Sequence, residues 1–143
     1  SSAASDVYKR QLDCCKHPSY QDLEGLRVSS HFFIDRSGRL FQYVSCLDRA
    51  WHAGVSSYEG RENCNDFSIG VELEGTDSAP YEQAQYETLG RLTDALAEAY
   101  PIKYVTGHSM IAPLRKTDPG PAFDWLTYES LCTTGKPLCF PYV

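Results

Sequence analysis

The second half of the chain carries a histidine, a lysine and an aspartate within one short stretch. His108 follows a β-prone segment, and Asp118 comes ten residues later on a loop that Pro119 and Gly120 constrain. Imidazole and carboxylate groups both bind zinc, and a catalytic zinc takes three protein ligands and keeps one position open. Lys116 projects the same way as Asp118 if its stretch is extended, and its ammonium can then stabilise an oxyanion. On spacing alone, an N-capping aspartate with a solvated loop lysine stays the alternative.

Two glutamates offer a general base. Glu72 and Glu74 lie in residues 67–74, where apolar and polar residues alternate as in a strand. This period places both glutamates on one face, opposite the apolar side chains. The functional interpretation is that one of them takes the proton of a zinc-activated water, and the alternative is a solvent-facing sheet surface. A glycosidase pair is discounted, because its two carboxylates must flank a sugar from opposite sides.

Two further histidines and a tryptophan have open roles. His31 opens a predicted strand, and His52 directly follows Trp51. Each histidine either lines a pocket or is a hydrogen-bonded structural residue, and the structural role is the default. Trp51 is either a wall for a sugar or peptide or a buried packing residue.

The elements that must position these residues are those of an α/β domain. Residues 31–44 predict a β-hairpin with its turn at 36–38, and residues 104–106 predict a short strand that leads into His108. Apolar residues at helical spacing predict a long helix over residues 81–99.

Further signals delimit that helix and the C-terminal region. Thr76 or Ser78 is expected to cap the long helix, and Pro101 ends it. Residues 111–123 are rich in Pro and Gly and predict a loop, and residues 124–131 predict a short closing helix. Strands separated by a helix predict an α/β fold in which a mixed central sheet packs against the long helix.

Composition excludes several classes of protein. A chain of 143 residues is long enough for one domain of ordinary globular composition. The net charge of −6 with scattered basic residues disfavours a nucleic-acid partner, and no apolar run is long enough for a membrane span. The six cysteines form no C-x-x-C pair, so we expect small buried or semi-buried thiols in a reducing compartment.

Several consecutive segments resemble one enzyme family. The chain is similar to the cytoplasmic 1,6-anhydro-N-acetylmuramoyl-L-alanine amidases of the AmpD type, which have the amidase-2 and peptidoglycan-recognition fold. The match runs from about Leu12 to Trp125. Its segments are residues 25–31, 49–58, 64–77, 106–108, 111–113, 115–121 and 123–125.

The resemblance implies a role for each candidate residue. His108 and Asp118 are the implied zinc ligands, Glu72 the implied base for the water, and Lys116 the implied support for the oxyanion. The implied substrate-binding residues are Arg27, Ala50 and Trp51. A second substrate-binding arginine of the family is replaced here by Asn63, so substrate affinity is expected to differ.

The implied activity is zinc-dependent hydrolysis of the amide bond between (1,6-anhydro-)N-acetylmuramic acid and L-alanine during cell-wall recycling. The expected partner is a small muropeptide, and the expected protein is a monomer in the bacterial cytoplasm. The alternative is a non-catalytic module that binds peptidoglycan fragments. A zinc peptidase would require a helical H-E-x-x-H motif, which the sequence lacks.

The N-terminal segment departs from the family. Residues 1–11 resemble nothing in it and are interpreted as a foreign header, residues 12–131 as the amidase domain, and residues 132–143 as a C-terminal tail. The family's first strand, which ends in a zinc-binding histidine, is not found, and His17 matches a different family position. The sequence as it stands is therefore expected to bind zinc weakly and to be almost inactive.

Overall fold

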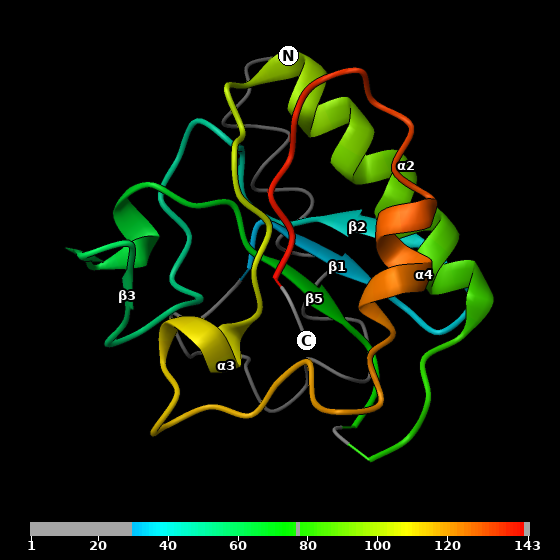
Figure 1. The fold of residues 1–143 in the computed structure, drawn as a ribbon, viewed down its shortest axis with the longest axis horizontal. Coiled ribbons are helices and arrows are strands. Elements are labelled where there is room, and N and C mark those ends of the chain that lie inside the picture. The colour runs from blue at the N-terminus through cyan, green and yellow to red at the C-terminus, as the bar shows by residue number, and fades with distance from the viewer. Residues whose placement is uncertain (1–29, 77, 142–143) are drawn as a thin grey trace. The chain divides into compact units, whose positions relative to one another are not determined.

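Three short strands form a mixed sheet. The computed structural model describes residues 30–76 and 78–141, and its sheet has the order β2–β1–β5. β1 (Phe32–Ile34) pairs antiparallel with β2 (Leu40–Gln42) and parallel with β5 (Val71–Leu73) (Figure 1). The predicted hairpin and the mixed character of the sheet are confirmed. The predicted strand over residues 67–74 is wrong in length, since only its last part pairs with a neighbouring strand.

The turn of the first hairpin is closed by an aspartate and a glycine. The Asp35 Oδ1 atom accepts hydrogen bonds from the backbone N–H groups of Ser37 and Arg39, at 3.0 and 2.9 Å. Gly38 has φ +86°, a conformation that glycine adopts without steric cost. Its carbonyl accepts a hydrogen bond of 2.6 Å from Thr88 Oγ1. This turn therefore packs against the long helix that carries Thr88.

The chain divides into two compact units. The first contains residues 1–34 and 40–74, and the second contains residues 35–39 and 75–143. In the first unit, Phe33, Tyr43, Val44 and Ala50 form a buried apolar cluster. The same unit has a second hairpin, made of β3 (Ser57–Tyr58) and β4 (Arg61–Glu62), which leads into a short 3₁₀ helix, η2 (Cys64–Asp66).

The second unit is organised around the long helix α2 (Gln83–Ala99). Its side chains Tyr86, Leu89, Leu92 and Ala97 are buried, which agrees with the predicted amphipathic pattern. The predicted capping residue was wrong. Glu82 stands at the N-cap, and its backbone N–H donates to Gln85 Oε1 at 2.9 Å, as in a capping box.

Two short helices and the C-terminal segment complete this unit. α3 (His108–Ile111) is a single turn, and α4 (Trp125–Ser130) is capped by the Asp124 carboxylate, which accepts from the N–H of Thr127. The short closing helix is thus confirmed. The predicted strand over residues 104–106 is reduced to one bridge between Tyr104 and Cys139. Within the described residues, no helix has the length and apolarity needed to span a membrane.

Candidate active site

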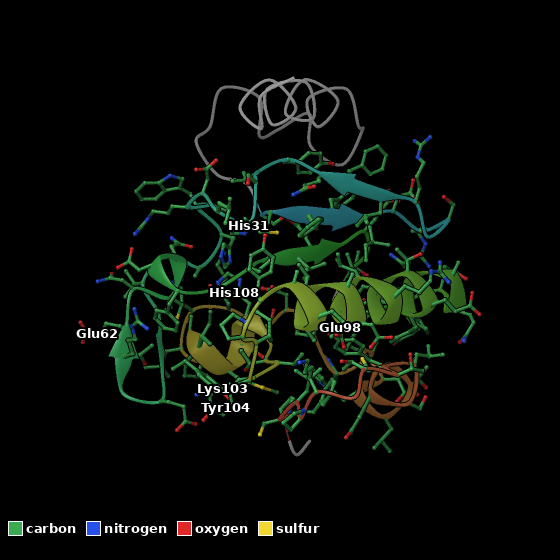
Figure 2. The ribbon with its side chains drawn as sticks, turned by 90° about the horizontal axis from the view of Figure 1, so that it is seen from above. His31, Glu62, Glu98, Lys103, Tyr104 and His108 are labelled. Carbon is green, nitrogen blue, oxygen red and sulfur yellow. The ribbon has the colours of Figure 1, made fainter. Side chains whose placement is uncertain are left out.

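The structure brings two of the predicted zinc ligands together. His108 begins α3 (Figure 2). Its Nδ1 atom lies 3.2 Å from Asp118 Oδ2. The His108 side chain is 18% exposed and the Asp118 side chain 52%, so the pair is open to solvent on one side. A pair that is held in place and still accessible can receive a ligand.

Backbone contacts hold the aspartate beside the histidine. The N–H of Ser109 donates to the Asp118 carbonyl at 2.8 Å, which fixes the loop against the first turn of α3. Gly107 lies so close to Pro119 that a Cβ atom there would come within 2.8 Å of the Pro119 Cδ atom. The approach of the two segments therefore requires a residue without a side chain at position 107.

A tyrosine and an aromatic cluster support the same loop. The Tyr81 hydroxyl donates to the Pro119 carbonyl at 2.9 Å, and the Tyr81 ring meets Phe123 edge-on at 5.7 Å. Around Phe123 pack the rings of Tyr86, Trp125 and Tyr128, at 5.3, 4.8 and 5.9 Å. Tyr81 was missed in the sequence, because its only signal is a position just before the long helix.

The electrostatics favour an ionised aspartate. The hydrogen bond from His108 lowers the pKa of Asp118, and this effect outweighs partial burial, which raises it. Electrostatic interactions with His108 and Lys116 lower the pKa further. Asp118 is thus a carboxylate at neutral pH, which is the form that binds a metal ion.

The geometry of the pair fits two positions of a zinc site. With metal–ligand bonds of about 2.0–2.1 Å, neighbouring corners of a zinc tetrahedron lie about 3.3–3.4 Å apart. The observed 3.2 Å between His108 Nδ1 and Asp118 Oδ2 is close to that edge. Among residues 30–76 and 78–141, however, no group of three His, Cys, Asp or Glu side chains is gathered for a metal. The described residues therefore bring together the two zinc ligands that the sequence analysis expects, His108 and Asp118.

The predicted base lies on a strand of the first unit. Glu72 is the exposed middle residue of β5 and pairs in register with Phe33 of β1. Two residues on, the N–H of Glu74 donates to the Ile34 carbonyl at 2.9 Å, which anchors the end of the strand. Glu72 thus sits on a strand that is fixed by its neighbour.

Two of the predicted substrate-binding residues, Ala50 and Trp51, belong to the same unit. Ala50 is buried, whereas Trp51 is 56% exposed with the Arg49 guanidinium 4.3 Å from its ring centre. Arg49 also forms an ion pair with Asp66. Trp51 is therefore not a core residue, and its exposed ring is held in place by Arg49. Arg27 lies outside the described residues.

His31 and His52 take structural roles. Both ring nitrogens of His31 have partners, namely the Asp48 carbonyl and the Gly70 N–H. His52 Nε2 lies 3.2 Å from Ser68 Oγ. Asn65, which the sequence analysis overlooked, accepts hydrogen bonds from the N–H groups of His52 and Ala53 through its side chain. A buried asparagine next to a short helix carries no distinctive sequence signal.

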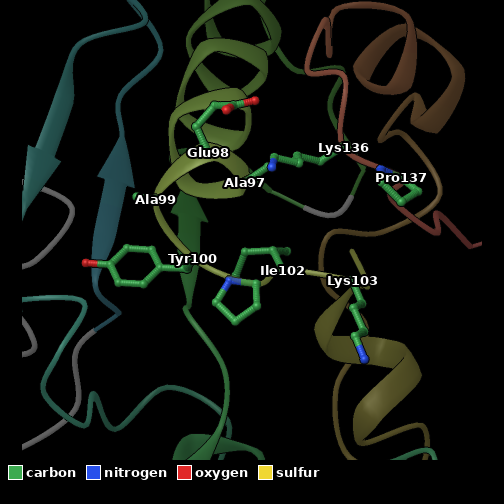
Figure 3. A pocket seen from close by; sticks show the side chains of 9 residues that line it. Ala97, Glu98, Ala99, Tyr100, Ile102, Lys103, Lys136 and Pro137 are labelled. Carbon is green, nitrogen blue, oxygen red and sulfur yellow. The ribbon is translucent and has the colours of Figure 1, made fainter.

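A shallow hollow of about 340 Å³ lies at the C-terminal end of α2, apart from the predicted residues (Figure 3). Its wall is formed by residues 97–103 together with Lys136 and Pro137. None of the predicted site residues lines this hollow, so it is not the site described above.

Comparison with known proteins identifies the family. The family model described as N-acetylmuramoyl-L-alanine amidase matches residues 2–121. The 1,6-anhydro-N-acetylmuramyl-L-alanine amidase AmpD of Citrobacter freundii is 55% identical over 129 residues, which cover 89% of this chain and 69% of that protein.

Solved structures agree with this match. A crystal structure of an AmpD derivative aligns with a TM-score of 0.73 and 52% identity, covering 89% of this chain and 72% of that one. Escherichia coli AmiD, in complex with anhydro-N-acetylmuramic acid-L-Ala-D-γ-Glu-L-Lys, aligns with a TM-score of 0.73 and 36% identity, covering 82% and 52%. The expected mixed α/β fold of this family is thereby confirmed, and the chain belongs to the N-acetylmuramoyl-L-alanine amidase family.

Proposed function

We propose that this chain hydrolyses the amide bond between 1,6-anhydro-N-acetylmuramic acid and L-alanine in muropeptides. Family membership supports the reaction type, and the AmpD relatives, named as 1,6-anhydro-N-acetylmuramyl-L-alanine amidases, support the anhydro sugar. The observation that carries the proposal is the His108–Asp118 pair, whose 3.2 Å separation fits two adjacent ligand positions of a zinc ion.

In this proposal His108 and Asp118 hold the metal. A bound zinc ion supplies Lewis acidity, which activates water near neutral pH and polarises an amide carbonyl. His108 contributes a neutral nitrogen donor, and the lowered pKa of Asp118 keeps its carboxylate ionised for binding.

In the same proposal Glu72 transfers a proton and Lys116 stabilises negative charge on the substrate. Glu72 takes a proton from the attacking water and returns it to the amine of the departing alanine, which leaves as a neutral group. The Lys116 ammonium offers positive charge to the oxygen that becomes negative as the amide carbonyl is attacked. These roles rest on the resemblance and on the chemistry of the two side chains.

Substrate recognition is assigned to three residues. Arg27 binds carboxylates of the peptide, and Ala50 and Trp51 contact the muropeptide. The exposure of Trp51 and the cation above its ring support a stacking surface for the sugar. Asn63 has φ +56°, a left-handed conformation in which asparagine is enriched, so its identity also suits the backbone there.

The number of zinc ligands with a counterpart in this sequence determines the zinc affinity that we expect. Since the resemblance gives counterparts in this sequence for two of the family's three zinc ligands, His108 and Asp118, we propose that the chain as it stands binds zinc weakly and turns over slowly. The amidase domain is assigned to residues 12–131, acting as a monomer on a small substrate in the bacterial cytoplasm.

The test is an assay of anhydro-muropeptides by mass spectrometry, with excess zinc and with a chelator. The expected result is slow loss of the anhydro-sugar mass, abolished by the chelator and by Glu72→Gln but retained in Glu74→Gln. Turnover that is insensitive to the chelator would overturn the zinc proposal. Tight muropeptide binding without any cleavage, even with excess zinc, would instead favour a non-catalytic binding module.

A further inference from the structure

One buried imidazole joins three segments of the first unit. His31, which directly precedes β1, has 1% of its surface exposed (Figure 2). Its Nε2 atom lies 2.8 Å from the Asp48 carbonyl, and its Nδ1 atom lies 3.1 Å from the Gly70 nitrogen. The ring therefore connects the start of β1 with the segment after Asp48 and with the residue that precedes β5.

These partners determine the protonation of the ring. A carbonyl oxygen accepts hydrogen bonds and cannot donate one, so Nε2 must carry the hydrogen toward Asp48. A backbone N–H only donates, so Nδ1 must be bare to accept from Gly70. The neutral imidazole protonated at Nε2 is the one form that satisfies both partners.

The His31 ring and its two hydrogen-bond partners form a bridge, and the Asp48 end of this bridge holds the segment proposed to bind substrate. Residues 49–51 lie between two anchors. One is the bond from His31 to the Asp48 carbonyl, and the other is the Asn65 side chain, which accepts from the N–H groups of His52 and Ala53 at 3.0 and 2.8 Å. Ala50 and Trp51 stand between these anchors, so loss of the first one frees their backbone on one side.

The Gly70 end of the bridge holds the backbone that leads into β5, the strand of the proposed base Glu72. Gly70 is buried, its carbonyl accepts from Phe32 N–H at 3.1 Å, and Val71 begins β5 immediately afterwards. A Cβ atom at Gly70 would come within 2.5 Å of the His52 ring, whose centre lies 5.7 Å from that of His31. The backbone that leads into Glu72 is thus held by one imidazole and packed against another.

We propose that His31 is a positioning residue of the amidase, whose neutral imidazole links the segment of Ala50 and Trp51 to the strand of Glu72. The proposal rests on the function proposed above for those three residues. His31 touches neither substrate nor water in this role, and it acts through the two backbone groups that it binds.

Two substitutions separate the two ends of the bridge. Asparagine carries its amide oxygen as many bonds from Cβ as histidine carries Nδ1, so His31→Asn can keep the acceptor for Gly70 and loses the donor to Asp48. Glutamine carries its amide nitrogen as many bonds from Cβ as histidine carries Nε2, so His31→Gln can keep the donor and loses the acceptor. His31→Phe keeps an aromatic ring and loses both.

The expected results differ between the variants. For His31→Asn, the Kd for an anhydro-muropeptide measured by calorimetry rises about tenfold, while exchange of the Gly70 amide hydrogen stays slow. For His31→Gln, Gly70 amide exchange accelerates at least about tenfold and the slow turnover with excess zinc falls, while the Kd is little changed. His31→Phe shows both defects.

Equal effects of the asparagine and glutamine variants on both readouts would overturn the proposal and leave a merely structural histidine. The wild-type chain offers a test that needs no variant: ¹⁵N NMR must show His31 neutral and protonated at Nε2 at neutral pH, and any other state refutes the bridge. Failure of the proposed function is recognised separately, because wild type then neither binds nor cleaves the muropeptide while the Gly70 exchange pattern is unaffected.

Discussion

At the scale of single residues, the chemistry proposed for this chain depends on the pair His108 and Asp118. Their 3.2 Å separation and the lowered pKa of Asp118 make a carboxylate–imidazole pair that suits a metal ion. The same two atoms form a hydrogen bond when no metal lies between them, so hydrogen bonding and metal binding use the same arrangement.

Removal of the charged donor is expected to weaken zinc binding. In Asp118→Asn the carboxylate becomes a neutral amide, and we expect the zinc Kd to rise by more than about 100-fold, beyond the effect of losing an outer-shell partner. Competition with a chromophoric chelator measures this change without any need for turnover. Glu87→Gln serves as the control, because it also replaces a carboxylate by an amide but at an exposed position on α2. We expect it to leave the zinc Kd unchanged. Equal affinities of the Asp118 variant and wild type would contradict the assignment.

The buried His31 is expected to make stability depend on pH. Burial lowers the pKa of His31 below its usual 6.5, against a smaller opposing effect of Asp48. As pH falls below about 6.5, the unfolded chain therefore takes up a proton at this histidine that the folded chain does not. The free energy of unfolding decreases from that point down to the folded-state pKa.

Urea unfolding at pH 7.5, 6.5 and 5.5 measures this slope, and His31→Phe is expected to flatten it. The carboxylates with lowered pKa, such as Asp118 and Asp35, lose their contribution only at more acidic pH, through and below about 4. A slope unchanged by His31→Phe would show that another group titrates in this window.

At the scale of the elements, close backbone approaches decide where the site residues lie. Gly107 lets α3 approach Pro119, and Tyr81 at the start of the α2 region binds the carbonyl of the same proline. The site in the second unit therefore depends on residues that have no chemical role themselves.

A methyl group at position 107 is expected to disturb this approach. In Gly107→Ala the new Cβ would lie 2.8 Å from Pro119 Cδ and 3.3 Å from the Trp125 ring, so α3 or the loop must move. We expect a loss of about 1–3 kcal/mol in stability, and a weaker zinc affinity as well. Gly135→Ala is the matched control, because its Cβ meets nothing within 4 Å. Similar melting temperatures for the two variants would refute the close approach.

The C-terminal segment is tied to α2 by two carboxylates, Asp94 and Glu98, the second of which accepts from the Thr134 hydroxyl at 3.0 Å. Asp94 accepts from the N–H of Thr133 at 2.9 Å, the N–H of Thr134 at 2.9 Å and the hydroxyl of Thr133 at 2.8 Å. We expect Asp94→Ala to cost about 1 kcal/mol and to speed proteolysis of residues 133–141, whereas Glu87→Ala on the same helix does neither. Limited proteolysis followed by mass spectrometry checks this expectation, and an unchanged cleavage rate would contradict it.

At the scale of the whole molecule, the question is how far folding depends on bound zinc. Each described unit has its own buried apolar side chains, namely the Phe33–Tyr43 cluster in the first and the rings around Phe123 in the second. Folding is therefore expected to depend little on zinc.

Zinc removal is expected to change the melting temperature by no more than about 2 °C, because a weakly bound ion stabilises the folded state by little. Scanning calorimetry with zinc at about the Kd measured by chelator competition, and with a chelator, measures the difference. A rise of about 8 °C or more with zinc would indicate a complete, tight site and would contradict the weak binding proposed here.

Local patterns in the sequence determined much of this protein. The alternation of apolar residues predicted the first hairpin, the period of the long helix predicted α2, and Asp124 marked the start of α4. These features depend on neighbours along the chain, which is why they are readable from the sequence. The consecutive segments around Trp51, Glu72, His108 and Lys116 likewise predicted the family, which the comparisons confirm.

Only the tertiary structure decided which of the alternatives holds at particular residues. The sequence left Asp118 between an N-cap and a ligand. The contacts of Ser109, Tyr81 and Pro119 place it beside His108, and its role as a ligand stays a prediction. The sequence also left His31 between a pocket and a structural role, and the partners Asp48 and Gly70, 17 and 39 residues away, decide for the structural one. Such contacts join segments that are distant along the chain, so no local pattern encodes them. The roles of the candidate site residues in the reaction all stay predictions, namely those of His108, Asp118, Glu72, Lys116, Arg27, Ala50 and Trp51.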